Sequence, residues 1–379
     1  MKARNAFNLL VLLGLIFLVG ACRGTLKRKS DAKNEKKYHI VAYVAGYRNF
    51  DFSTIDVSRL THINYAFVNI KDGEVIFDTT KIDGKSLTPL DLDKLNELKK
   101  TNPALQILVS AGGWSWSKGF SDAALTYHSR KKFAESCVRL VQQYHLDGID
   151  LDWEYPNQSG AGNTFRPEDV HNFTLLLQAV REALDLQTKA DGTGKHYLLT
   201  IATGADKNYV QNTELGQVQQ FVDFINIMTY DFYNGWHKTT GHHSNYQPSA
   251  HPELDQNSVV NAVDLHLKAG VPASKINLGI PLYGRKWEGV TPSGDQVLFQ
   301  KAETVGMGID YINFASDIDQ NGYKRYWDDT AKAPYLWNAE KRIFISYEDA
   351  QSIQCKMEYL KNKGRSEEHT SELQSLRHL

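Results

Sequence analysis

The segment Asp147–Pro156 reads DGIDLDWEYP, and it is the stretch that decides the fold of this chain. Side chains two positions apart on a β-strand point to the same face, so Asp150, Asp152 and Glu154 share one face and apolar residues share the other. Three acids on one face of a buried strand are costly to ionise together, which pushes their pKa values apart. Burial and like charge favour a proton on at least one of them, and that is the condition for a general acid at neutral pH.

The acidic face has two other interpretations, a solvated strand and a metal site. A solvated strand fits poorly because the intervening and flanking residues are apolar. A metal site would require histidine or further oxygen ligands nearby, and none is evident in this pattern. We therefore interpret Asp147–Pro156 as a catalytic strand and expect neither a metal nor an organic cofactor.

Short apolar runs rich in β-forming residues alternate with amphipathic stretches along most of the chain. Strands that recur with intervening helices form right-handed βαβ units and a parallel sheet. Seven such units predict the α/β class, namely a (β/α)8 TIM barrel whose eighth strand and helix are missing. The runs are 39–46, 61–70, 105–111, 148–153, 197–203, 221–229 and 276–283, and the clearest helical patterns are 129–144, 167–186, 258–269 and 347–363.

The alternation stops between Arg285 and Arg342. This stretch is rich in Tyr, Trp, Gly and Asp, and it is too long for a loop between a strand and a helix. We predict a small α+β domain inserted at about 286–344. On the C-terminal face of the barrel, such an insertion would raise one wall of a cleft.

The N-terminus has the pattern of an export signal. Lys2 and Arg4 precede an apolar run over 9–21, which is too short to span a bilayer that needs about 20 residues. Residues 18–22, LVGAC, resemble a bacterial lipobox, so we expect cleavage of a lipoprotein-type signal peptide at 1–21 and lipidation of Cys22. Residues 22–37 are mostly charged and predict a flexible tether. The expected location is the cell envelope, on the outer membrane or surface, or otherwise the secreted fraction.

The C-terminus departs from the pattern of the rest of the chain. Residues 365–375, RSEEHTSELQS, resemble the translation of a common sequencing adapter. We therefore expect the catalytic barrel to comprise residues 38–364 and the segment 365–379 to be non-native. An unbroken reading frame through these codons in genomic DNA would contradict this hypothesis.

The composition excludes some partners. Among 379 residues, 43 Lys and Arg nearly balance 44 Asp and Glu, which gives no electrostatic footprint for nucleic acid or an anionic membrane. A membrane is therefore expected to be contacted only through the lipid at Cys22. Cys137 and Cys355 lie within helical patterns and are expected to be buried free thiols. Aromatic residues make up 11% of the chain, which favours a ligand that stacks, such as carbohydrate, and we expect a monomer.

DGIDLDWEYP resembles the signature of glycoside hydrolase family 18, the chitinases and their relatives. The resemblance extends from about Tyr38 to Gly364. Ser110–Trp114, SAGGW, is similar to the SxGG element after the third strand of that family. The segments 228–231, MTYD, and 282–285, LYGR, resemble the sixth- and seventh-strand elements, and 287–344 resembles the insertion domain of the branch with deep clefts.

The resemblance implies an endo-acting hydrolase of β-1,4 bonds in chitin or chitooligosaccharides. In that family the acetamido carbonyl of the substrate attacks the anomeric carbon, with retention of configuration and without an enzyme nucleophile. It assigns Glu154 as the acid and base, Asp152 as the group that orients the acetamido N–H, Asp150 as the acid that shares a proton with Asp152, and Tyr230 as the donor to the acetamido oxygen. The family also has a tryptophan on its eighth strand, and its absence implies a poorly active chain.

The resemblance further implies a set of substrate-binding residues. For several of them the residue pattern leaves a structural alternative open, since strand-end aromatics also form the core layers of barrels and an Asp or Arg can simply close a strand end. Trp114 and Trp236 follow strand ends and are better candidates for sugar stacking, whereas Trp153 and Trp337 are expected to pack internally. The expected binding residues are Tyr43, Phe67, Trp114, Met228, Asp231, Trp236, Tyr283 and Arg285.

Two other functions remain open on the sequence. The first keeps the mechanism and changes the substrate to N-glycan cores or peptidoglycan fragments, against which the insertion argues. The second is a chitin-binding lectin of the same fold. Such lectins usually lack the acid, whereas Glu154 is present here.

Overall fold

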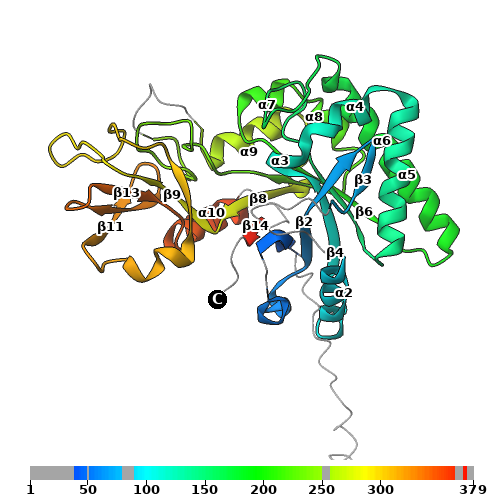
Figure 1. The fold of residues 1–379 in the computed structure, drawn as a ribbon, viewed down its shortest axis with the longest axis horizontal. Coiled ribbons are helices and arrows are strands. Elements are labelled where there is room, and N and C mark those ends of the chain that lie inside the picture. Colours follow the sequence, from blue (N-terminus) through cyan, green and yellow to red (C-terminus); the bar gives the residue numbers. More distant parts are fainter. Residues whose placement is uncertain (1–37, 49–50, 79–88, 250–256, 363–369, 374–379) are drawn as a thin grey trace, which may run out of the picture. The chain divides into compact units, whose positions relative to one another are not determined.

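Seven parallel strands form the barrel sheet that the sequence predicts (Figure 1). The computed structural model describes residues 38–48, 51–78, 89–249, 257–362 and 370–373. The expected export signal, the tether and the lipidation site at Cys22 lie outside the described residues. In spatial order the seven strands are β1 (Val41–Ala45), β2 (His62–Lys71), β4 (Gln106–Gly112), β5 (Gly148–Asp152), β6 (Leu198–Thr203), β7 (Phe224–Ile227) and β8 (Ile276–Pro281).

A short eighth strand corrects one expectation from the sequence. β14 (Thr370–Leu373) lies between β8 and β1 and pairs in parallel with both, so the circle of strands closes. The backbone groups at the edges of β8 and β1 can pair with any extended segment, which is why this position does not depend on a recognisable strand sequence. The strand has only four residues and comes from the segment 365–379, and no helix follows it among the described residues.

Helices cover the outside of the sheet, and the four clearest sequence patterns are confirmed as helices. α5 begins with a capping box in which Thr126 and Ser129 bond each other's backbone N–H groups, and Ser258 caps α9. α2 was not among the predicted helices. The helices are α2 (Leu90–Glu97), α3 (Gly113–Trp116), α4 (Phe120–Leu125), α5 (Tyr127–Gln143), α6 (Asp169–Asp191), α7 (Lys207–Gln211), α8 (Leu215–Val218), α9 (Val259–Lys268) and α10 (Ala350–Asn362). None of the helices in the described ranges is long and apolar enough to span a membrane.

The two faces of β5 have different surroundings, as its alternation predicts. Ile149 and Leu151 are fully buried in the large apolar core. Trp153 continues this face and stacks on Phe120, with ring centroids 5.2 Å apart, and it meets Phe173 edge-on at 5.4 Å. The prediction that Trp153 packs internally is confirmed. The acidic side chains therefore face the interior of the barrel.

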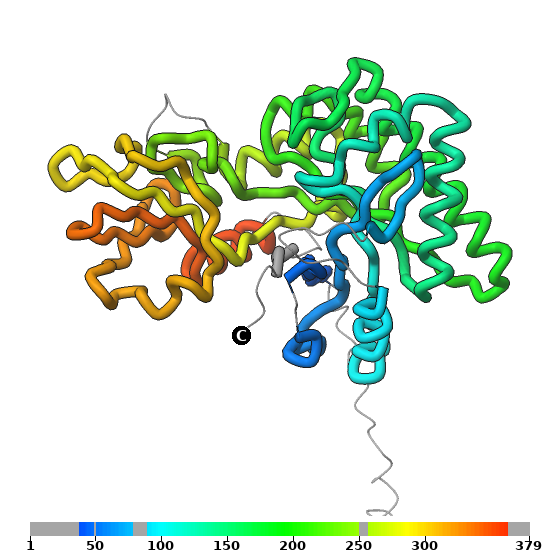
Figure 2. The backbone as a smooth tube through the Cα atoms, in the orientation of Figure 1, coloured from blue at the N-terminus to red at the C-terminus, as the bar shows by residue number. Residues whose placement is uncertain are grey.

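The inserted domain is an antiparallel sheet that starts directly after β8, with Leu282 alone between the two (Figure 2). It has its own apolar core, in which Trp287, Leu336 and Phe344 are fully buried. Trp337 packs against this core, as expected. The sheet has the order β10-β9-β13-β12-β11, formed by β9 (Tyr283–Trp287), β10 (Met307–Asp310), β11 (Tyr323–Asp328), β12 (Ala333–Asn338) and β13 (Ile343–Ser346), while β3 (Glu74–Ile76) extends the barrel sheet beyond β2.

A buried ion pair joins α10 to the segment after β7. Lys356 is fully buried, and its Nζ lies 2.7 Å from Glu348 Oε1. The same Nζ donates to the carbonyl oxygen and the Oγ of Ser244 at 2.7 and 2.9 Å. Three acceptors therefore satisfy the three donors of this ammonium group, which offsets the cost of its burial.

Removal of one partner from this pair should be strongly destabilising. We expect Lys356→Met to lower the free energy of unfolding by about 3–5 kcal/mol, because it leaves Glu348 as a buried charge without its cation. Lys332→Met is the matched control, since the exposed Lys332–Asp329 pair should contribute about 0.5 kcal/mol or less. Urea unfolding of both variants measures the difference, and equal effects would contradict this account.

Candidate active site

The three acids of β5 become less buried toward the C-terminal end of the strand. The side chains of Asp150, Asp152 and Glu154 are 0%, 4% and 9% exposed. The Oγ of Ser117 accepts from the backbone N–H of Glu154 at 2.9 Å and donates to the carbonyl oxygen of Asp152 at 3.1 Å. Ser117 thus fixes the backbone at the point where the acidic face meets the solvent-accessible end of the barrel.

Asp150 lies at the centre of a hydrogen-bond network from four strands. Ser110 on β4 and Thr200 on β6 are its register neighbours, and their hydroxyls donate to its two oxygens at 2.7 and 2.5 Å. The Tyr43 hydroxyl donates to Asp150 Oδ2 at 3.0 Å and accepts from the Asn226 amide at 2.9 Å. Burial raises the pKa of Asp150 above its ordinary value, and these hydrogen bonds act in the opposite direction.

The Gly112–Gly113 pair allows the chain to turn closely against the acidic strand. Gly112 has φ of +104°, and a Cβ there would lie 2.2 Å from the backbone oxygen of Asp152. Gly113 has φ of +71°, and a Cβ there would lie 2.8 Å from the ring of Phe67. Only glycine fits both positions without displacing Asp152 or Phe67, which explains the SAGGW motif.

A cleft of about 1060 Å³ opens at this end of the barrel. It brings together almost all of the predicted site residues, although they come from seven different segments of the chain. Asp150 does not line the cleft, because it lies beneath Asp152 and Tyr43 in the barrel interior. The predicted residues that line it are Tyr43, Phe67, Trp114, Asp152, Glu154, Met228, Tyr230, Asp231, Trp236, Tyr283 and Arg285.

The far side of the cleft from Glu154 contains a bidentate ion pair. Arg285 donates from Nε and Nη2 to the two oxygens of Asp231 at 2.8 and 2.5 Å. Burial acts to raise the pKa of Asp231, but contacts with His243 and Arg285 outweigh it and lower the pKa to about 2. Tyr230, the neighbour of Asp231, meets Tyr283 edge-on at 6.1 Å. Asp231 is thus a fixed negative charge beside two tyrosines.

Two exposed tryptophans and two buried tyrosines give the cleft aromatic surfaces at different depths. Trp114 and Trp236 are 43% and 78% exposed, whereas Tyr43 and Tyr283 are less than one-tenth exposed. An exposed indole with one free face is suited to stack on the apolar face of a sugar ring. Among the described residues there is no group of three or more His, Cys, Asp or Glu side chains that could hold a metal ion.

The family model described as "Glycosyl hydrolases family 18" matches residues 39–365. The chain belongs to glycoside hydrolase family 18. The Gly-Gly turn, the acidic strand and the Tyr230–Asp231 segment of this family 18 chain all lie within the matched residues.

Chitinases are among the similar proteins. Chitinase A1 of Niallia circulans is 40% identical over 391 residues, which cover 88% of this chain and 56% of that protein. Chitinase B of Serratia marcescens is 32% identical, covering 80% of this chain and 71% of the relative. This family 18 chain thus spans a little over half of Chitinase A1. A solved structure titled as a family 18 N-acetylglucosaminidase from Paenibacillus barengoltzii matches with a TM-score of 0.80 and 41% identity, covering 89% of this chain and 95% of the other.

Sequence reasoning missed several residues of this family 18 site. Thr200 and Asn226 contact the Asp150 network from inward-facing positions of β6 and β7, and the signal was a polar residue within an apolar strand run. Tyr155 lines the cleft beside Glu154, and burial raises the pKa of its phenol well above the ordinary value. Arg48 and Asp310 also line the cleft and form an ion pair of 2.6 Å, for which no local pattern provides a signal.

The low pKa of Asp231 predicts a pH-dependent contribution to stability. A carboxyl group that ionises at about 2 when folded, below its ordinary 3.8, stabilises the folded state above 3.8 and loses this contribution as the pH falls toward 2. Asp231→Asn should therefore cost about 1–2 kcal/mol near neutral pH, allowing for the partial exposure of the carboxylate. The gap should shrink below 3.8.

Urea unfolding across pH measures this effect. Asp122→Asn is the matched control, because Asp122 forms an exposed pair with Arg166 and should contribute about 0.5 kcal/mol or less. A constant gap between the Asp231 variant and the unchanged chain at all pH values would show that the carboxylate charge is not the cause.

Proposed function

We propose that this protein hydrolyses β-1,4 glycosidic bonds in chitin and N-acetylglucosamine oligomers, with internal bonds of the polymer as its targets. One observation carries the proposal. A row of inward-facing acids rises from the barrel interior to a large cleft, with Glu154 as the last and most exposed member. Membership of family 18 and the similarity to proteins named chitinases support the same reaction.

Glu154 is the proposed general acid and base. It lines the cleft at the end of β5, and Ser117 fixes its backbone. It protonates the glycosidic oxygen as the bond to the leaving sugar breaks, and the resulting carboxylate then takes a proton from water. No second carboxylate is required as a nucleophile, because the acetamido carbonyl oxygen of the substrate forms the bond to the anomeric carbon and is released when water attacks. The product retains the anomeric configuration.

Asp152 and Asp150 are proposed to stabilise the acetamido group as positive charge develops on it. Asp152 lines the cleft and faces the acetamido N–H, while Asp150 lies deeper on the same face of β5. Burial raises the pKa of Asp150, which favours a proton shared between the two acids in the resting site. Electrostatic stabilisation by fixed groups of this kind contributes to catalysis because it requires no reorganisation during the reaction.

The opposite wall of the cleft is proposed to hold the acetamido oxygen and the sugars. Tyr230 donates its hydroxyl to that oxygen, and Met228, Tyr283 and the Asp231–Arg285 pair surround it. Tyr43 and Phe67 form the floor, and Trp114 and Trp236 stack on sugars at the mouth. Positioning by this wall supplies much of the rate enhancement, since the attacking oxygen belongs to the substrate itself.

We also propose that the protein is exported and anchored by a lipid on Cys22. The support is the sequence of residues 1–22, in which a basic start and a short apolar run precede LVGAC. Chitin is an insoluble polymer outside the cell, so an exported enzyme would meet it directly.

Glu154→Gln provides the central test of the catalytic role. We expect hydrolysis of chitotetraose to fall about 10²–10⁴-fold, because the amide cannot donate the proton, while binding of the oligomer survives. Glu340→Gln alters an exposed glutamate outside the cleft and should leave the rate unchanged. A lectin would bind chitotetraose equally well in all three forms and hydrolyse it in none.

The products and the acetyl requirement test the reaction type. Proton NMR of fresh products should show the β anomer, and a fully deacetylated oligomer should be cleaved at least about 100-fold more slowly, because it lacks the attacking carbonyl. Rapid cleavage of the deacetylated compound would overturn the mechanism. Release of single N-acetylglucosamine units from chain ends would instead assign the activity of the Paenibacillus relative.

Lipidation of Cys22 can be tested separately. On expression in a bacterium, the chain should incorporate labelled palmitate and sediment with membranes, and Cys22→Ala should abolish both. Cys355→Ala, which changes a partly buried thiol of α10, is the control and should retain both. Label in the Cys22 variant would exclude this anchor.

A further inference from the structure

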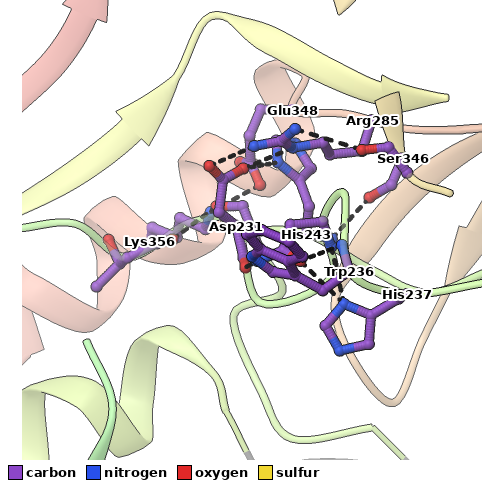
Figure 3. A network of polar contacts seen from close by, with 12 residues as sticks. Asp231, Trp236, His237, His243, Arg285, Ser346, Glu348 and Lys356 are labelled. Carbon is purple, nitrogen blue, oxygen red and sulfur yellow. Dashed lines mark hydrogen bonds and ion pairs between the residues drawn. The ribbon is translucent and has the colours of Figure 1, made fainter. Parts of the chain in front are cut away.

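A histidine lies behind the Asp231–Arg285 pair, outside the cleft (Figure 3). His243 is fully buried and is not among the residues that line the cleft. Its backbone N–H donates to Ser346 Oγ at 2.9 Å, and its carbonyl oxygen accepts from the backbone N–H of Phe232 at 3.1 Å. His243 is therefore held between the inserted sheet and the residue that directly follows Asp231.

The imidazole ring of His243 has an unusual environment for a buried polar group. Neither ring nitrogen has a hydrogen-bond partner within the described part of the chain. Nδ1 lies 3.7 Å from Asp231 Oδ1, which is longer than a hydrogen bond but within reach of a small movement of either side chain. A buried nitrogen without a partner is costly, and leucine would fill the space without that cost. The ring therefore calls for a functional explanation.

The charged groups around His243 favour the neutral ring. The Asp231 carboxylate attracts a proton to the ring, but Arg285 already neutralises it from the other side. Glu348 is the next nearest acid and is paired with Lys356. On the same segment, His242 pairs with Asp328 instead. Burial lowers the pKa of His243, and the charge of Arg285 acts in the same direction.

The backbone of Asp231 also requires support. Asp231 has φ of +60°, a left-handed conformation that is unfavourable for a residue with a side chain. The Phe232–His243 hydrogen bond holds the chain on one side, and Arg285 holds the carboxylate on the other. The His243 ring also contacts Tyr283, with centroids 5.4 Å apart, and Tyr283 packs edge-on against Tyr230.

We propose that His243 is a positioning residue for the reaction. Its neutral ring backs the Asp231 carboxylate on the side away from the cleft and fixes the orientation that Asp231 shares with Arg285, Tyr283 and Tyr230. This inference rests on the proposed function, since Tyr230 and Asp231 act there on the acetamido group. His243 itself touches neither the substrate nor the reacting atoms.

The proposal has a consequence for the pH dependence of turnover. A proton on His243 at acid pH would place a second cation beside Arg285 and turn Asp231 toward the ring. The Asp231–Arg285 geometry at the cleft wall would then change, and kcat would fall. Asparagine keeps an N–H donor near the position of Nδ1 but does not titrate. Leucine keeps the volume and loses the donor.

The experiment compares His243→Asn and His243→Leu with the unchanged chain on chitotetraose. We expect the leucine variant to lose about tenfold in kcat near neutral pH with KM changed less than about threefold, and the asparagine variant to recover most of that loss. We expect the acid limb of kcat to move to lower pH in the asparagine variant. His242→Asn is the matched control, because His242 is equally buried on the same segment but pairs with Asp328, and its kcat profile should match the unchanged chain.

Several outcomes would overturn the proposal. An unaltered kcat and pH profile in both His243 variants would exclude a positioning role. A loss in the asparagine variant as large as in the leucine variant, with an unmoved acid limb, would assign His243 to packing alone. Should the leucine variant fail to fold, the pH profile of the asparagine variant decides the question by itself.

A measurement without substrate separates this proposal from the proposed function. A buried histidine with a lowered pKa takes up its proton only on unfolding, so it makes the folded state less stable as the pH falls below the ordinary 6.5. The unchanged chain should therefore lose more of its urea midpoint on acidification than His243→Asn does. Equal losses would refute the neutral ring, whereas an inactive chain that shows the expected difference would refute only the proposed function.

Discussion

The structure depends on the burial of one carboxylate, that of Asp150, in the middle of the barrel. An acid in this position is tolerated only because hydroxyl groups from the neighbouring strands point at its two oxygens. Ser110 and Thr200 are its register partners on β4 and β6, so the correct strand register and the satisfaction of Asp150 are the same condition. A shift of β5 by one residue would bury Leu151 among these hydroxyls and turn the acids toward the helices.

The acidic strand reaches the cleft because its burial decreases along its length. Period-two spacing places Asp152 and Glu154 on the same face as Asp150, each nearer to solvent than the last. The Gly112–Gly113 turn brings the neighbouring chain so close that a side chain at Gly112 would collide with the Asp152 backbone. The proposed acid therefore stands on a rigid strand with its position fixed by packing, and the loops around it supply the binding surfaces.

Much of this arrangement could be predicted from the sequence because it depends on local patterns. Alternation within short runs predicted the seven strands, and the spacing of Asp150, Asp152 and Glu154 predicted their common face. Contacts between distant segments carry no such pattern. The Asn226–Tyr43 hydrogen bond and the Arg48–Asp310 ion pair join residues far apart in the chain, and the pairing of β14 uses backbone groups that every residue has. His243 gave no signal because its significance lies in what surrounds it.

The inserted sheet is part of the active site and not an appended module. Leu282 is the whole connection between β8 and β9, so Tyr283 and Arg285 extend the barrel wall while they pair within the insertion. Arg285 binds Asp231, Ser346 of the same sheet holds the backbone of His243, and α10 beyond the sheet holds Ser244 through Lys356. Movement of the insertion would therefore shift both sides of the Asp231 carboxylate together. Since the barrel alone would leave Asp231 without its cation, the insertion and the cleft chemistry must be conserved or lost as one unit.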